Sequence, residues 1–192
     1  MTPRTLAAAL LGLFATSSLA QGLADEDRDW GVAPQSVLRT APYTAPTPLE
    51  VGGARRVRTD DLRRILAEGG KTLLVDVASG EGHATVPGAL WWPGMGRGAN
   101  FVDAIQGELA QRLEQATGGD KAATLAFFCV NPRCWLSYNA SLRAVALGYT
   151  RVLWYRGGVE AWREAGLPLG RARDPWAPAG PPEPRGEAGN AR

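Results

Sequence analysis

Histidine and cysteine are scarce in this chain, and their scarcity excludes several kinds of site. The 192 residues contain one histidine, His83, and two cysteines, Cys129 and Cys134. Three such side chains cannot supply the four ligands of a structural Cys/His zinc site. A Ser-His-Asp triad would have to use His83, since no other histidine exists. We therefore expect no metal and no other cofactor.

An excess of charge of one sign is also lacking. Lys and Arg number 21 against 19 Asp and Glu, which gives a net charge of +2, and no basic run is longer than the pair Arg55 and Arg56. A protein that binds nucleic acid by neutralising phosphates needs clustered positive charge. The composition therefore predicts no nucleic-acid partner. With 45% hydrophobic residues, the chain can bury the core of one ordinary domain.

The only long hydrophobic run lies at the N-terminus, where residues 1–20 have the pattern of a secretory signal peptide. Arg4 is followed by an apolar stretch from Leu6 to Phe14, and Ser18 to Ala20 end in small residues. The apolar stretch is too short to span a bilayer. The pattern predicts an exported, periplasmic protein that has no membrane anchor after cleavage. Export also permits disulfides to persist.

The mature chain divides by composition into three parts. Residues 21–58, which include four prolines between Pro34 and Pro48, are typical of an extended arm or linker. Residues 59–170 are expected to form one folded domain. Residues 171–192 are rich in Pro and Gly and predict a disordered tail.

Within the domain, apolar runs alternate with segments of helical periodicity. Short apolar runs predict buried strands, and the intervening segments end at glycines, as helices do. The predicted strands are 72–77, 124–128 and 151–155, and the helices begin near 59, 101, 135 and 159. Strands separated by helices imply right-handed crossovers. The pattern predicts a single α/β domain whose parallel sheet has helices on both faces.

Both cysteines follow the second of these strands, where open α/β sheets place their ligands. Asn131 is a good N-cap residue and Pro132 suits a first helical position, so we expect the next helix to begin there. Cys129 would then precede the helix and Cys134 would lie in its first turn. The helix dipole and free N–H groups would lower the thiol pKa values and hold an anion such as thiosulfate or a persulfide terminus. The predicted catalytic residues are Cys129 and Cys134, and the predicted substrate- or anion-binding loop residues are Val130, Asn131, Arg133 and Trp135.

Simpler interpretations of the two cysteines stay open. They could form a structural disulfide, although a loop of this length would stabilise the fold only slightly. They could also be two inert buried thiols. A reactive loop is the interpretation we favour, and the residues alone do not indicate which thiol attacks.

Other side chains near the strand ends also have two interpretations. His83 is expected to be a solvated loop residue rather than a base. Asp76 could accept hydrogen bonds beside the site, or it could be only a turn residue with no role there. The tryptophans, among them Trp91 and Trp135, are expected mainly to pack in the core, with these two as candidate walls of a cysteine pocket.

Several motifs together resemble the rhodanese-like domain superfamily. They are a strand followed by Cys129, the segments 147–152 and 157–168 with their glycines, Asp76 and Val77, and residues 86–89 (VPGA). The arm at 38–48, residues 87–91 and 117–120, and the CWLSYNA stretch from Cys134 are most similar to one branch. That branch contains exported "CXXCW motif" proteins associated with catabolism by pyrroloquinoline-quinone-dependent (PQQ-dependent) dehydrogenases. The resemblance covers about residues 59–169.

The resemblance implies a rhodanese fold and assigns the persulfide-forming nucleophile to Cys129. Two positions depart from the pattern. Cys134 stands where rhodanese loops commonly carry Arg, and Thr85 stands where the superfamily has His. Related phosphatases would need Arg where this chain has Trp135, so phosphate-ester chemistry is not expected.

Two functional hypotheses follow from the resemblance and the cysteine pair. The first is thiosulfate or persulfide sulfurtransfer, or thiol–disulfide exchange. In both, Cys129 forms a persulfide or a mixed disulfide, and Cys134 then resolves it. Its partner would be a small sulfur donor or acceptor, or a thiol. The alternative is a non-catalytic accessory protein that binds a periplasmic PQQ-dependent dehydrogenase or its cytochrome.

Overall fold

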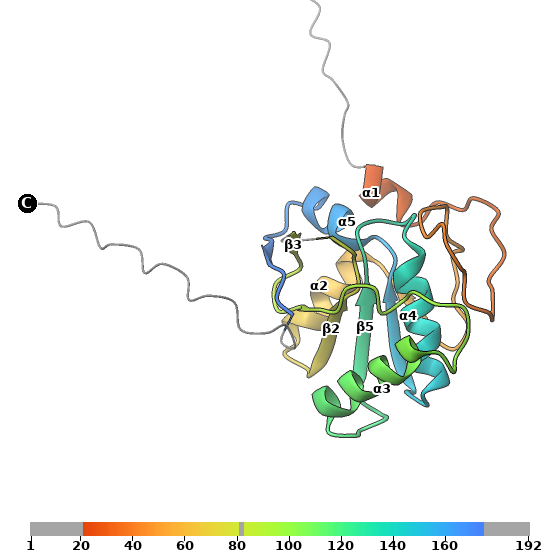
Figure 1. Ribbon diagram of the computed structural model, residues 1–192. Coiled ribbons are helices and arrows are strands. Elements are labelled where there is room, and N and C mark those ends of the chain that lie inside the picture. Colours follow the sequence, from red (N-terminus) through yellow and green to blue (C-terminus); the bar gives the residue numbers. More distant parts are fainter. Residues whose placement is uncertain (1–20, 81–82, 175–192) are drawn as a thin grey trace, which may run out of the picture.

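A computed structural model describes residues 21–80 and 83–174 of the chain. The predicted signal peptide and residues 175–192 of the predicted tail lie outside the described residues. The described part is built around a five-stranded sheet with helices on both sides (Figure 1).

The central sheet is parallel throughout, in the order β1-β6-β5-β2-β4. Its apolar strands are buried, as is usual for parallel sheets. The long strands β2, β5 and β6 coincide with the three predicted strands, which confirms the predicted α/β class. The strand bounds are β1 (Arg55–Val57), β2 (Thr72–Asp76), β4 (Leu90–Trp91), β5 (Thr124–Phe128) and β6 (Arg151–Tyr155).

Helices cover both faces of this sheet, because side chains alternate between the faces along each strand. In β5, Leu125 and Phe127 belong to the core cluster that contains residues of α3 and α4. Ala126 and Phe128 belong to the cluster that contains residues of α2 and α5. The helix bounds are α1 (Gln21–Asp25), α2 (Thr59–Ala67), α3 (Ala104–Thr117), α4 (Trp135–Ala146) and α5 (Gly158–Glu164).

The segment expected to be an arm is integrated into the domain. It contributes α1 and the edge strand β1, and Leu38 and Val51 are buried in a third core cluster with Trp135 and Trp154. This packing against α4 and β6 makes the segment part of the folded body rather than a linker. Both secondary-structure elements are too short to leave a periodic signal in the sequence.

The start of the predicted tail is also ordered. Strand β7 (Gly170–Arg171) pairs antiparallel with β3 (Ala84–Thr85), and the N–H of Trp91 donates to the Arg173 carbonyl over 2.8 Å. Asp174 forms an ion pair with Arg112 at 3.3 Å. The tail prediction is therefore wrong for residues 171–174.

Arg156, directly after β6, holds the N-terminal segment on the domain. Its side chain is 2% exposed. Its five N–H groups donate to the carbonyls of Asp25, Glu26, Arg28 and Thr47 and to the Thr47 hydroxyl, at 2.9–3.0 Å. Burial lowers the pKa of Arg156 to about 10, mainly by desolvation of the charge. Because every donor is paired, the guanidinium fixes the path of residues 25–47.

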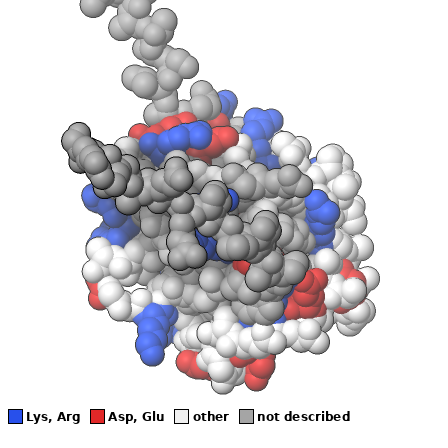
Figure 2. All heavy atoms as spheres, turned by 60° about the vertical axis from the view of Figure 1, so that its left-hand side comes forward, with Lys and Arg blue, Asp and Glu red and all other residues white. Residues whose placement is uncertain are grey.

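The described surface carries mixed charge. On the face drawn in Figure 2, Lys and Arg and Asp and Glu are scattered in small groups among uncharged residues, and neither sign forms one large patch on the visible described surface. In residues 21–80 and 83–174, no helix is both long and apolar enough to cross a membrane.

We predict that Arg156→Gln lowers the free energy of unfolding by about 3 kcal/mol, because it leaves several buried carbonyls without donors. Urea unfolding monitored by tryptophan fluorescence measures this loss. The matched control is Arg163→Gln on the exposed side of α5, for which we expect a change of about 0.5 kcal/mol or less. Equal effects of the two substitutions would contradict the anchoring role of Arg156.

Candidate functional site

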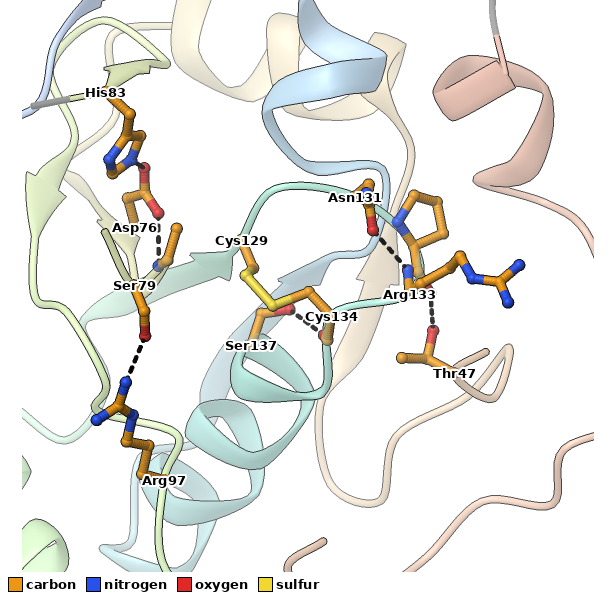
Figure 3. The surroundings of a disulfide bond; sticks show 12 residues. Thr47, Asp76, Ser79, His83, Arg97, Cys129, Asn131, Arg133, Cys134 and Ser137 are labelled. Carbon is orange, nitrogen blue, oxygen red and sulfur yellow. Dashed lines mark hydrogen bonds and ion pairs between the residues drawn. A yellow bond between two sulfur atoms is a disulfide. The ribbon is translucent and has the colours of Figure 1, made fainter. Parts of the chain in front are cut away.

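Cys129 and Cys134 form a disulfide at the carboxyl end of β5, with their Cα atoms 6.1 Å apart. Figure 3 shows this bond joining the end of the strand to the start of α4. Parallel α/β sheets place their ligand sites at this end of the strands. The structure therefore brings the two predicted catalytic residues together where the fold rule expects a site.

The helix start predicted from Asn131 and Pro132 is wrong, whereas the start near residue 135 predicted from the apolar pattern is confirmed. Helix α4 begins at Trp135, and Cys134 is its N-cap residue in extended conformation (φ −98°, ψ 107°). Asn131 stabilises the loop instead of capping the helix, since its side-chain oxygen accepts a hydrogen bond from the Arg133 N–H at 3.0 Å. A β-bridge to Thr44 and the bond to Cys129 hold Cys134 outside the helix. These tertiary contacts outweigh the local preference of Asn and Pro for a helix start.

The first half of the loop rests on α5. The N–H groups of Val159 and Glu160 donate to the carbonyls of Cys129 and Val130 at 3.0 and 2.9 Å. This approach requires Gly158, whose φ is +66° and whose added Cβ would lie 2.5 Å from the Cys129 carbonyl oxygen.

The second half of the loop rests on the N-terminal arm. The Thr47 hydroxyl donates to the Pro132 carbonyl over 2.6 Å, and the Ala45 N–H donates to the Arg133 carbonyl over 2.9 Å. The Cys134 N–H returns to the Asn131 carbonyl at 3.1 Å, and the Ser137 hydroxyl donates to the Cys134 carbonyl at 3.3 Å. Every carbonyl from residue 129 to residue 134 thus has a hydrogen-bond donor.

The residues predicted to bind an anion surround the disulfide, but several of their N–H groups are already used. The N–H groups of Arg133 and Cys134 donate within the loop, and that of Trp135 donates to the Tyr43 carbonyl at 2.9 Å. The Arg133 side chain is exposed, with its guanidinium 5.7 Å from the Trp30 ring. Val130 is 38% exposed. In this oxidised form, the start of α4 is covered by the arm.

The two sulfur-bearing residues differ in accessibility. Cys129 is 2% exposed and packs in the core cluster on the α3/α4 side of the sheet. Cys134 is partly exposed and caps a helix of 12 residues. A thiol at a helix N-terminus has a lowered pKa, because the positive end of the dipole stabilises the thiolate. Solvent access and the helix dipole therefore both favour Cys134 over Cys129 as the sulfur that reacts with a partner.

His83 lies outside the helices and strands, as expected, but its side chain is paired with Asp76 and is only 24% exposed. Its Nε2 donates to the Asp76 carboxylate over 2.7 Å, and its ring lies edge-on to Trp91 with centroids 5.3 Å apart. Asp76 is fully buried and also accepts from the Ala78 N–H and the Thr85 hydroxyl. The hydrogen bond to Asp76 raises the pKa of His83, burial opposes this, and the carboxylate charge adds to it. Asp76 is thus an acceptor that organises the loop after β2.

Most of the described tryptophans pack in the core, as expected. Trp135 is fully buried, and its Nε1 donates to the Pro46 carbonyl at 3.1 Å. It therefore binds the arm and does not line an open pocket. Trp91 is partly exposed and donates to the Ala78 carbonyl. Over the described ranges, no group of three His, Cys, Asp or Glu side chains is arranged to hold a metal ion.

The family profile of the "Rhodanese-like domain" matches residues 58–165, which is more than half of the chain and includes the cysteine loop. The chain belongs to the rhodanese-like domain family. This membership confirms the predicted superfamily and fold. The finer branch of PQQ-associated proteins stays an expectation.

Solved structures of low identity show similarity to this rhodanese-like chain. The BH2092 protein of Bacillus halodurans is 22% identical (61% of this chain, 77% of that chain, TM-score 0.45). A thiosulfate sulfurtransferase from Pseudomonas aeruginosa is 18% identical (63% and 21%, TM-score 0.47). Ygr203w, a yeast protein tyrosine phosphatase of the rhodanese family, is 19% identical (59% and 87%, TM-score 0.45). Among curated proteins, none matches significantly.

We predict that the His83–Asp76 contact makes stability depend on pH. The pKa of His83 is raised in the folded state, so its contribution is fully present below the unfolded value of about 6.5 and is lost as pH rises through the folded value. Urea unfolding of the wild type and of His83→Gln from pH 5.5 to 9 measures this. The stability difference between the two proteins should be largest at low pH. A difference that grows with pH contradicts the assignment.

We further predict that Gly158→Ala lowers the free energy of unfolding by about 3 kcal/mol, because both the positive φ and the contact with the Cys129 carbonyl become unfavourable. Gly166→Ala is the control, since Gly166 has φ +71° but an added Cβ would meet nothing within 4 Å. It should cost about 1 kcal/mol. Similar losses in chemical denaturation would show that the close approach of α5 to the loop is unimportant.

Proposed function

We propose that the Cys129–Cys134 pair is a dithiol/disulfide site that exchanges with the thiol of a partner in an oxidising compartment. The observation that carries this proposal is the asymmetry of the pair. One sulfur-bearing residue is partly exposed at a helix N-terminus, and the other is buried in the core. A site of this kind needs one sulfur that a partner can reach and a second sulfur held close enough to resolve the mixed disulfide.

The proposed reaction balances without another reactant. A partner thiolate attacks Sγ of Cys134, the bond between the two protein sulfurs breaks, and the electron pair leaves on Cys129 as a thiolate. A second partner thiolate then attacks the partner sulfur of the mixed disulfide, the bond to Cys134 breaks, and its electron pair leaves on Cys134 as a thiolate; both protein thiolates take up protons from water. The protein gains two electrons and two protons, and the partner becomes a disulfide. The reverse sequence oxidises the protein pair.

Sulfurtransfer is a second candidate, supported by the position of Cys129 directly after the central strand β5 in a rhodanese-like domain. In the reduced protein, the Cys129 thiolate would take the outer sulfur of thiosulfate and release sulfite. Cys134 would then attack the inner sulfur of the persulfide, releasing hydrosulfide and restoring the disulfide. This route needs a reductant before each turnover, and Cys129 must become accessible.

The association with PQQ-dependent alcohol oxidation rests on the motif resemblance alone. We retain it as the context in which a thiol partner, or a dehydrogenase bound without chemistry, would be sought. Retained biological function of a Cys129→Ser/Cys134→Ser double variant would favour the accessory role over both chemical ones.

We predict that Cys129→Ser, which leaves Cys134 as the only thiol, reacts with oxidised glutathione at least about tenfold faster than Cys134→Ser does, because the remaining thiol is accessible and near the helix N-terminus. Intact mass spectrometry over time measures the glutathione adducts. A faster reaction of Cys134→Ser refutes the assignment of Cys134 as the accessible sulfur.

The wild-type protein provides the controls for that experiment. Before reduction its mass should be two hydrogens below that of the dithiol, and a glutathione buffer should convert one form into the other. A disulfide that no thiol buffer reduces in the folded protein contradicts the exchange function. A gain of one sulfur from thiosulfate that requires Cys129 supports sulfurtransfer instead.

A further inference from the structure

We propose that Thr47, an arm residue 82 positions before Cys129, is a positioning residue that sets the redox equilibrium of the Cys129–Cys134 pair. This inference rests on the proposed exchange function. Thr47 lies in the arm, yet it touches the loop two residues before Cys134, and nothing in its sequence context indicated that contact.

The Thr47 hydroxyl forms the middle of a buried relay. Thr47 is 1% exposed. Its Oγ1 accepts the Nε–H of Arg156 at 3.0 Å and donates to the Pro132 carbonyl at 2.6 Å. Because Arg156 can only donate, the hydroxyl proton is free to point at Pro132. The direction of the hydrogen bond to the loop is therefore fixed by the guanidinium.

Pro132 is a sensitive point at which to hold the loop. Proline has no N–H, so its carbonyl is its only backbone hydrogen-bonding group. The neighbouring loop carbonyls of Arg133 and Cys134 accept from the Ala45 N–H and the Ser137 hydroxyl. Of the links between arm and loop, that of Thr47 comes from a side chain of the arm and can be removed without altering any backbone group.

Holding this loop affects the dithiol more than the disulfide. In the oxidised protein the covalent bond already keeps the sulfurs together. In the reduced protein only the surrounding contacts keep the two thiols close, and this closeness is their effective concentration for reforming the bond. Loss of the Thr47 link gives the reduced loop more conformations. The disulfide then forms less favourably, and the reduction potential becomes less negative.

The test compares Thr47→Val with the wild type in a series of reduced and oxidised glutathione mixtures at fixed pH. The oxidised fraction is read by thiol alkylation and intact mass. We expect the equilibrium constant for disulfide formation to fall about three- to tenfold in Thr47→Val, and tenfold corresponds to about 30 mV. Thr47→Ser keeps the hydroxyl and should restore the wild-type value.

Thr117→Val is the matched control, because the Thr117 hydroxyl also donates to a backbone carbonyl, that of Leu113, at the C-terminal end of α3 away from the loop. It should lower stability without moving the redox equilibrium. If Thr47→Val does not fold, Thr47→Ala is compared with Thr47→Ser. This pair again differs in whether residue 47 carries a hydroxyl.

The outcomes separate the two claims. If the wild type equilibrates with glutathione and Thr47→Val has the same constant, the positioning role is wrong and the exchange function stands. An equal shift in Thr117→Val would also overturn the positioning role, because the effect would then follow general stability. If the wild-type pair does not equilibrate at all, the exchange function itself fails.

Discussion

The need to pair the six backbone carbonyls of residues 129–134 is the constraint on which this structure depends. A loop at the end of a buried strand must find donors for its carbonyls. Here α5 and the arm supply two donors each, and the loop itself and Ser137 of α4 supply the other two. This requirement accounts for the left-handed glycine at the start of α5 and for the long route of the arm past the start of α4. The disulfide lies between these two supports, so its geometry is set by parts of the chain far away in sequence.

Two buried arginines also join segments that are far apart in the sequence. Arg156 binds the N-terminal segment, and Arg143 in α4 donates to Asp103, Gln106 and the carbonyls of Arg97 and Asn100. Burial alone would raise the pKa of Asp103, but its hydrogen bonds, above all that from Arg143, lower it. Paired in this way, buried charges are tolerated and fix the loops that they contact.

The sequence predicts the strands 124–128 and 151–155 with their observed bounds, because each is a short, mainly apolar run of the length of a buried strand and lies between segments of helical periodicity. It also predicts the cysteine pair at the right end of the sheet. It fails where tertiary contacts prevail over local preference: at Asn131, which would start a helix in isolation, and at His83, whose pairing with Asp76 seven residues earlier it does not predict. The arm contacts leave no local signal at all, since Thr47 and Pro132 are 85 residues apart.

The arm is synthesised long before the residue that binds it. Residues 25–47 leave the ribosome long before Arg156, which lies 131 positions after Asp25 and supplies the donors for their carbonyls. Until then the carbonyls that Arg156 binds lack these donors, while Cys129 and Cys134, five positions apart, are already both present in the chain. Docking of the arm is therefore a late event with high contact order, and it completes only on a chain made through α5. Both cysteines are thus synthesised before the last residue of the support that surrounds their disulfide.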